Sequence, residues 1–235
     1  SAHVSLAPDL IQVLKDLDKP LDQTVAELIV LELYREGRLS SGKAAELLGL
    51  SRLAFIQYAS SRAIPFFDLT EQELLSDIEN VANARIVVSD SSPLIALEHL
   101  GRLHLLTALF GEVLIPRAVA SEVAPRSLPA AIRVLALANP ISPQILHPSL
   151  GRGETEVLAI ALEHKATLVL LDDRAARRVA TSLGLTVSGT LGILLDAKRE
   201  GLVAEVKPLM RDLRSLPFHI SNALYAAVLR QAGEG

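Results

Sequence analysis

Four short acidic segments in the second half of the chain have the residue types expected of a divalent-metal site. Two of them directly follow apolar runs typical of buried strands, and in a parallel sheet the strand ends line the functional crevice. Carboxylates gathered there repel one another and need a cation, and oxygen ligands of this kind suit Mg²⁺ or Mn²⁺. The spacing therefore predicts metal-dependent phosphodiester hydrolysis. The candidate ligands are Asp90, Glu122, Glu154, Glu156, Asp172 and Asp173.

Each acid also has a purely structural interpretation. Asp90 precedes Ser91-Ser92-Pro93 and is suited to cap a helix, because proline favours the first helical turn. Asp172 and Asp173 are suited to a turn and an N-cap. Glu154 and Glu156 fall where a helix begins, and acids are favourable there in any case. Two positions apart, these glutamates are separated by about 200° around the helix, so they cannot face one crevice equally.

Composition predicts a folded protein with a sizeable core. The 235 residues are 50% hydrophobic and 21% charged, but only 3% aromatic, so the core depends on aliphatic side chains. Cysteine is absent, which excludes disulfides and thiolate metal ligands and agrees with a reducing compartment. No apolar run approaches the roughly 20 residues of a membrane span. These features predict a soluble cytoplasmic protein with no membrane partner.

The charge distribution divides the chain into an acidic first part and a weakly basic second part. Residues 1–84 hold 7 Lys and Arg against 13 Asp and Glu, whereas residues 85–235 hold 16 against 14. Opposite net charges favour attraction between the two parts, although ordinary solvated surfaces give the same sums. We therefore expect two domains, 1–84 and 85–235.

The first part has the pattern of a helix-turn-helix. An amphipathic segment over 21–36 is followed by Ala45, Gly49 and Phe55, the spacing at which a small residue, a turn glycine and an apolar residue lock two crossing helices. Ser51 is a natural N-cap for the second helix. A plain helical hairpin is the alternative. If the unit binds operator DNA, the candidate contacts are Lys43, Arg52, Gln57, Tyr58 and Arg62.

The segment from about Thr24 to Asp77, with Ser41 to Arg52 and Ile64 to Asp68 as its motifs, resembles a family of small bacterial and archaeal predicted antitoxins. In such antitoxins the segment beyond the DNA-binding unit embraces a toxin. The resemblance thus implies that residues 64–84 cover a partner surface.

The second part alternates apolar strand patterns with helical patterns. Such alternation predicts a parallel sheet covered by helices on both faces, an α/β/α three-layer domain after a small all-α domain. Three prolines predict a loop over 139–150. Strands are expected at 86–89, 113–115, 167–171 and 185–187, and helices near 93–109, 117–124, 130–138, 154–164, 174–183, 190–200 and 203–214.

The segments Val87 to Leu97, Ile115 to Glu122, Gly151 to Ala161, Leu170 to Arg177 and Gly189 to Leu194 resemble PIN-domain proteins in content and order. PIN domains of this branch, related to VapC-like toxins, are ribonucleases that bind Mg²⁺ or Mn²⁺. The resemblance implies that Asp90 is the central ligand, with Glu122, Glu156 and one of Asp172 and Asp173 around it. It favours Glu156 over Glu154 and gives Ser92 a supporting role.

RNA is the expected substrate. Arg174, Arg177 and Arg178 are candidates to bind its phosphates, although a solvated helix face explains them equally well. We expect the fused antitoxin-like segment to restrain the nuclease, with Arg62 or Arg85 reaching into the acidic crevice as a cation. Homodimer formation is expected by resemblance.

Two other functions fit parts of the sequence. A DNA-binding regulator with a catalytically inactive PIN-like scaffold would keep the acids as helix caps and bind Mn²⁺ weakly. A nucleotide-binding α/β domain lacks its glycine-rich phosphate fingerprint, because Gly151-Arg152-Gly153 alone is not one.

Overall fold

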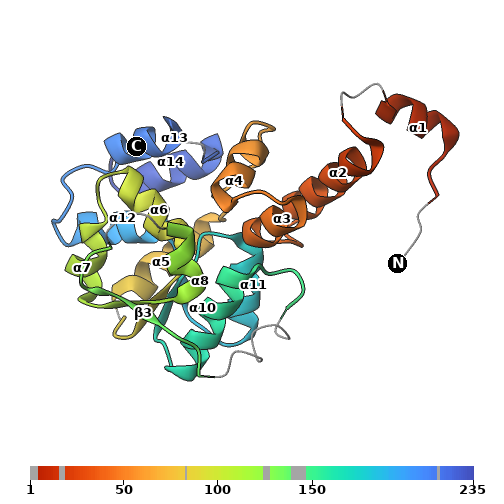
Figure 1. Cartoon of the computed structure of the whole chain (residues 1–235). Helices are drawn as coiled ribbons and strands as arrows, with labels where there is room; N and C mark the ends of the chain where they lie inside the picture. The colour runs from red at the N-terminus through yellow and green to blue at the C-terminus, as the bar shows by residue number, and fades with distance from the viewer. Residues whose placement is uncertain (1–4, 16–18, 83, 124–127, 139–146, 216–217) are drawn as a thin grey trace.

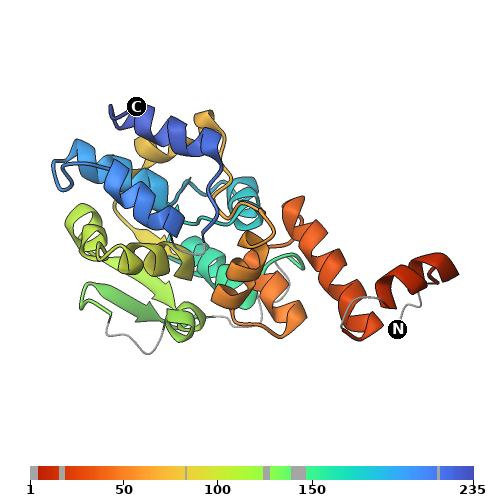
Figure 2. The same cartoon turned by 90° about the horizontal axis from the view of Figure 1, so that it is seen from above.

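A computed structural model describes residues 5–15, 19–82, 84–123, 128–138, 147–215 and 218–235. The helices of the first part are α1 (Pro8–Lys15), α2 (Leu21–Arg35), α3 (Ser41–Leu48), α4 (Arg52–Ser60) and α5 (Glu71–Ala82). In two views at right angles, α1 and the start of α2 project away from the rest of the chain (Figures 1 and 2). The predicted loop over 139–150 lies mostly outside the described residues.

The helix-turn-helix geometry predicted for α3 and α4 is present. Gly49 takes a left-handed conformation with φ of 65° between the two helices. The side chain of Ser51 accepts a hydrogen bond from Ala54 N and caps α4. Phe55 is fully buried and packs edge-on against Tyr34 of α2, with ring centroids 5.0 Å apart. This small core joins α2, α3 and α4.

A five-stranded parallel sheet forms the centre of the second part, in the order β3-β2-β1-β4-β5. Helices flank the sheet, and α10 packs on its central strands. The α/β fold predicted from the sequence is confirmed. The elements after α5 are β1 (Val87–Ser89), α6 (Ser91–His99), α7 (His104–Phe110), β2 (Val113–Pro116), α8 (Arg117–Val123), β3 (Ile132–Leu135), α10 (Arg152–Glu163), β4 (Leu168–Leu170), α11 (Arg174–Ser182), β5 (Val187–Ser188), α12 (Thr190–Arg199), α13 (Lys207–Ser215) and α14 (Asn222–Gln231).

Two element predictions were wrong. The helix expected over 130–138 is the edge strand β3, in which Ile132 is buried and Val134 is 48% exposed. Parallel pairing with β2 satisfies the backbone of these four residues. The single helix expected over 93–109 is divided into α6 and α7, where Gly101 takes a φ of 65°. Helix α14 was not predicted, although Ser221 caps it.

The main hydrophobic core extends across the predicted boundary between residues 84 and 85. Phe66, Phe67, Leu74 and Val81 are buried in the same core as the sheet. Helix α5 packs on α12 and β5, and Phe66 N donates a hydrogen bond to the carbonyl of His219 at 3.0 Å. The segment after α4 is therefore built into the second part, whereas α2 to α4 have a core of their own.

Candidate active site

Three acidic side chains from different elements converge at the carboxyl end of β1. Asp90 follows β1 and is fully buried; it stands at the N-cap position of α6 but makes no side-chain capping hydrogen bond. Glu122 lies on α8, and its side chain is 28% exposed. Glu154 lies in the first turn of α10 and is fully buried. Parallel strands and the helix after Gly151 bring these distant residues to one place.

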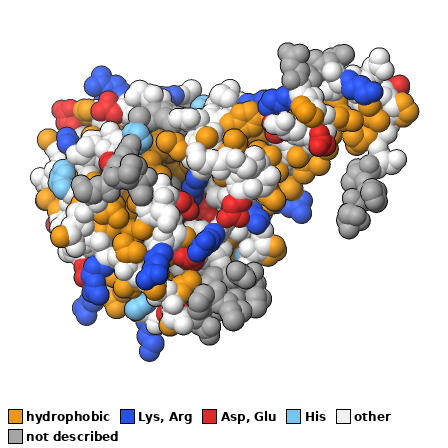
Figure 3. Space-filling model, viewed as in Figure 1, with side chains coloured by type: hydrophobic (Ala, Val, Ile, Leu, Met, Phe, Trp, Pro, Cys, Tyr) orange, Lys and Arg blue, Asp and Glu red, His pale blue; other side chains and the backbone are white. Residues whose placement is uncertain are grey.

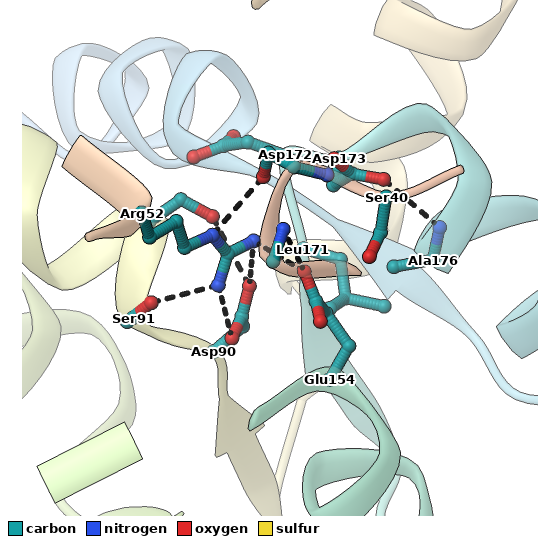
Figure 4. A network of polar contacts seen from close by, with 12 residues as sticks. Ser40, Arg52, Asp90, Ser91, Glu154, Leu171, Asp172, Asp173 and Ala176 are labelled. Atoms are coloured by element: carbon teal, nitrogen blue, oxygen red, sulfur yellow. Dashed lines mark hydrogen bonds and ion pairs between the residues drawn. The ribbon is translucent and has the colours of Figure 1, made fainter. Parts of the chain in front are cut away.

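The guanidinium of Arg52 lies among the three carboxylates, and Figure 4 shows it beside Asp90 and Glu154. Its Nη2 is 2.8 Å from both Asp90 Oδ2 and Glu154 Oε1. Its Nη1 is 2.9 Å from Asp90 Oδ1 and 3.4 Å from Glu122 Oε2. Arg52 is the first residue of α4, so the second helix of the helix-turn-helix supplies the cation of the acidic group.

Serine hydroxyls fix the positions of these charges. Arg52 Nε donates to Ser41 Oγ at 3.0 Å, and Nη1 donates to Ser91 Oγ at 2.8 Å. Ser91 Oγ in turn donates to Glu122 Oε2 at 2.5 Å. Ser92 Oγ donates to Asp90 Oδ2 at 3.2 Å, which is the contact expected of a supporting residue. The site is thus held by a connected network of hydrogen bonds.

The amino end of α3 also faces the acids. Ser41 N donates to Asp173 Oδ2 at 2.7 Å, and Gly42 N donates to Glu154 Oε1 at 3.2 Å. A helix amino end carries a partial positive charge, so it adds to the compensation by Arg52. A Cβ on Gly42 would lie 2.4 Å from Glu154 Oε2, and only glycine permits this approach.

Burial dominates the protonation behaviour of the site. It raises the pKa of Glu154 to about 8, and it also raises the pKa of Glu122 and of Asp173. For Arg52 burial acts to lower the pKa, but the nearby carboxylates outweigh it and hold the pKa well above its ordinary value. The arginine therefore stays charged, and the acids outnumber it.

One edge of the contact between the N-terminal helices and the rest of the chain is polar and exposed to solvent. Arg152 N donates to Glu46 Oε1 at 2.7 Å, and Lys43 Nζ lies 3.3 Å from Glu46 Oε2. In the space-filling view, acidic and basic side chains gather where the N-terminal helices meet the rest of the molecule (Figure 3). Deeper in the contact, Gly151 N donates to Ser40 Oγ at 3.1 Å.

Two family models match the chain, and together they account for nearly all of it. The model described as a PIN domain matches residues 86–234, and the model described as an uncharacterised protein family, UPF0175, matches residues 2–83. The chain belongs to the PIN domain family. A UPF0175 protein of Archaeoglobus fulgidus is 42% identical over 65 residues, which are 27% of this chain and 72% of that relative. No solved structure matches the chain.

The protein therefore fuses a UPF0175 segment, which is antitoxin-like, to a PIN domain. The resemblances inferred from its motifs are confirmed. All of the converging carboxylates lie in the PIN domain, whereas Arg52, Ser41 and Gly42 lie in the UPF0175 segment. The two matched regions thus meet in two places: α3 and α4 at the acidic group, and α5 on α12 and β5.

Two acids predicted as ligands lie apart from this group. Glu156 Oε1 accepts from Arg152 Nε at 2.8 Å, and its Oε2 accepts from Ala118 N at 3.2 Å. The structure differs here from the prediction that favoured Glu156, because Glu154 is the glutamate that faces Asp90 and Arg52. Their angular separation on α10 explains why only one of them does so.

Asp172 and Asp173 point to different partners. Both oxygens of Asp172 accept hydrogen bonds from Thr190, one from its N and one from its Oγ1, each at 2.7 Å. Burial raises the pKa of Asp172 to about 6, although these hydrogen bonds oppose the shift. Asp173 caps α11 through Ala175 N and Ala176 N while also accepting from Ser41 N. Asp173 is therefore the fourth acid beside the group, and Asp172 holds the start of α12.

Neither Arg62 nor Arg85, the arginines expected to enter the crevice, lies there. Arg62 stacks over the ring of Tyr58 at 4.4 Å, and Arg85 is exposed. The residues that cover the acids come from 40–52 instead of 64–84. Arg52 itself was expected to touch DNA, but its side chain is only 5% exposed here. Its position after a capping serine gave no indication of this contact, which depends on how α4 packs against the second part of the chain.

The other predicted nucleic-acid contacts lie on varied surfaces. Gln57 is exposed on α4, whereas Tyr58 is half-buried and donates to Glu27 at 2.9 Å. Arg177 is buried in an ion pair with Asp77. No membrane-spanning helix is present among the described residues.

The acidic group fits a divalent cation in its chemistry. Asp90, Glu122 and Glu154 present only hard oxygen donors, which Mg²⁺ and Mn²⁺ prefer. Glu154 Oε2 is buried and accepts no hydrogen bond from any described residue. With Arg52 between the carboxylates, the described part of the chain holds no group of three or more acids or histidines arranged for a metal ion. The donors are of the kind that a divalent metal ion prefers, and the guanidinium of Arg52 lies between them.

Proposed function

We propose that the protein is a metal-dependent endoribonuclease whose UPF0175 segment keeps its PIN domain closed. The observation that carries this proposal is that one guanidinium from the first part contacts three carboxylates of the second. An arginine there supplies the positive charge that the acids need, so the closed form is stable without a metal ion. RNA is proposed as the substrate because the PIN motifs resemble those of toxin ribonucleases.

Opening of the site would exchange one cation for another. With Arg52 withdrawn, Asp90, Glu122 and Glu154 would hold Mg²⁺ or Mn²⁺. The bound ion would polarise the scissile phosphate and lower the pKa of a water molecule. Ser91 and Ser92 would keep Glu122 and Asp90 oriented, and a carboxylate would accept the proton of the attacking water.

The closed contact offers three separate sources of stabilisation. Arg52 neutralises part of the acidic charge, the amino end of α3 donates to Asp173 and Glu154, and Gly42 fits against Glu154. Breaking a buried ion pair by removing one partner costs about 3–5 kcal/mol. The Arg52→Ala substitution should therefore weaken closure by a factor of roughly 10² to 5 × 10³ if the two parts separate.

The test uses the full chain, because α5 contributes to the core of the second part. Removal of residues 1–84 would remove α5 and expose that core. Wild-type protein, Arg52→Ala, and Arg52→Ala with Asp90→Asn are incubated with labelled single-stranded RNA in Mn²⁺ or in EDTA. We expect Mn²⁺-dependent cutting by Arg52→Ala alone. Arg38→Ala, which removes a side chain 67% exposed on the same segment, is the matched control.

Cutting by Arg52→Ala that persists with Asp90→Asn would show a contaminant or a different site. No cutting by Arg52→Ala, together with no Mn²⁺ binding by calorimetry, would favour a regulator with an inactive PIN scaffold. Operator DNA binding through Gln57, Tyr58 and Arg62, location in the cytoplasm and homodimer formation remain predictions.

A further inference from the structure

Helix α11 carries three arginines with different surroundings. Arg177 is buried and bonded to Asp77 and to the carbonyl of Leu171, so it serves the fold. Arg174 and Arg178 are one helical turn apart and therefore lie on one side of α11. Both of them contact the UPF0175 segment, which distinguishes them from an ordinary solvated helix face.

The partners of these two arginines are oxygen acceptors of the first part. Arg174 Nη1 lies 2.7 Å from Asp68 Oδ2, and Arg178 Nη2 donates to the carbonyl of Gly37 at 2.7 Å. A Cβ on Gly37 would lie 2.8 Å from Arg178 Nη2 and 3.1 Å from Arg174 Cδ. The turn after α2 thus rests directly on both side chains.

Arg174, the first of these two arginines, lies next to Asp173 at the edge of the acidic group. Arg174 follows Asp173, whose carboxylate contacts Ser41 at the edge of the closed site. A groove of about 590 Å³ lies along α11, and Asp68, Arg174 and Arg178 are among the residues that line it, together with the acids Glu73 and Asp77. An RNA strand that enters the acidic group needs cations close by, because the carboxylates themselves repel its phosphates.

We propose that Arg174 and Arg178 bind RNA phosphates beside the scissile bond, and that Gly37 and Asp68 occupy this phosphate site in the closed chain. The inference rests on the proposed nuclease function and extends it. The UPF0175 segment then blocks the PIN domain in two ways: Arg52 takes the place of a cation, and the oxygens of Gly37 and Asp68 take the place of phosphates.

The contact of Arg174 with Asp68 is one that an RNA phosphate can replace. Their side chains are 54% and 43% exposed, and exposed ion pairs of this kind contribute little to stability. Release of the unit that contains α2 and α3 would free Arg178 from Gly37. Asp68 follows the buried Phe67 and stays nearby, so it competes with phosphate for Arg174.

The test measures binding of a fluorescein-labelled single-stranded RNA by anisotropy in EDTA, with the full-length Arg52→Ala protein. We expect Arg174→Ala with Arg178→Ala to weaken binding about 10-fold and to reduce the slope of log affinity against log salt by about 1.4, since each single-strand phosphate contact contributes about 0.7. Asp68→Asn should strengthen binding about 2-fold to 3-fold by freeing Arg174. A gain of this kind cannot arise from misfolding.

Arg133→Ala is the matched control, because Arg133 is an exposed arginine on β3 paired with Glu112. An equal loss with this control, an unchanged salt slope in the double variant, or no RNA binding by the Arg52→Ala protein would overturn the site. Cleavage is scored separately in Mn²⁺. RNA binding that depends on Arg174 and Arg178, without any cleavage, would support the phosphate site and reject the nuclease function. Cleavage by the Arg52→Ala protein, with RNA binding unchanged in the double variant, would support the nuclease function and reject the phosphate site.

Discussion

Two buried arginines join the first part of the chain to the second, and they do so in opposite ways. Arg177 of the PIN domain pairs with a single acid, Asp77 of α5: its Nη2 and Nη1 lie 2.5 and 3.1 Å from the carboxylate oxygens. Its Nη1 also donates a hydrogen bond to the carbonyl of Leu171. Arg52 of the UPF0175 segment meets three acids, and Glu154 Oε2 stays without a hydrogen bond from the described residues.

The difference separates a structural ion pair from a replaceable cation. At Arg177 one charge offsets one charge and all contacts are satisfied, so a metal ion has no place there. At Arg52 the acids exceed the cation, and the group has the donors of a divalent-metal site. The number of acids around each buried arginine therefore distinguishes the two sites, whereas burial does not.

We expect the largest effect on stability when each of the two buried arginines is removed in turn. Arg52→Ala and Arg177→Ala should each lower the free energy of unfolding by about 3–5 kcal/mol, because each leaves buried carboxylates unpaired. Mn²⁺ should restore stability only to Arg52→Ala, by about 2.7 kcal/mol at a concentration 100 times its Kd. Thermal melts with and without Mn²⁺ check this. Equal rescue of both variants would remove the distinction between the sites.

Replacement of both partners of an ion pair gives a second test of the difference between the Arg177 and Arg52 sites. Arg177→Met with Asp77→Leu should recover most of the stability lost in Arg177→Met, because an apolar pair of similar volume can replace a buried ion pair at little cost. Arg52→Met with Asp90→Leu should stay destabilised by about 2–3 kcal/mol or more, because Glu122 and Glu154 remain. Urea unfolding of these three variants and of Arg52→Met provides the measurement, and full recovery at the Arg52 site would contradict its charge excess.

A smaller effect is expected from crowding at the contact. Gly42→Ala places a methyl group 2.4 Å from Glu154 Oε2 and should weaken closure by about 1–3 kcal/mol without removing any charge. We expect increased Mn²⁺ binding and increased RNA cleavage relative to wild type. Gly101→Ala is the control, because its positive φ of 65° makes alanine destabilising through the backbone while its Cβ position has open space around it. Activation by Gly101→Ala would show that general destabilisation suffices.

The smallest effect concerns the start of the helix that carries Arg52. Ser51→Ala removes the hydrogen bond from Ala54 N and should cost about 1 kcal/mol of stability. Ser221→Ala removes the equivalent cap of α14 and should cost about the same. Only Ser51→Ala should also raise Mn²⁺ affinity, because only α4 positions a residue in the acidic group. Calorimetric titration with Mn²⁺ distinguishes the two variants.

Local patterns predicted much of this fold because each depends on neighbouring residues. Gly49 and Ser51 marked the turn and the cap of the helix pair, and the apolar runs before Asp90 and Asp172 marked central strands. The edge strand β3 was missed because its four residues acquire their conformation by pairing with β2, a contact that no local pattern contains. The choice between Glu154 and Glu156 likewise depended on the rotation of α10 against the sheet.

Periodicity, capping and motifs are local, so they were sufficient to predict an acidic, helical, antitoxin-like segment before an α/β domain with carboxylates at its strand ends. The identity of the cation that meets those carboxylates depended on contacts between residues far apart in the chain. Arg52 was one of several basic residues in a helix-turn-helix, and Arg62 and Arg85 had the same charge. The choice followed from the docking of α3 and α4 against α10, where Gly42 and Gly151 allow the backbones to approach closely.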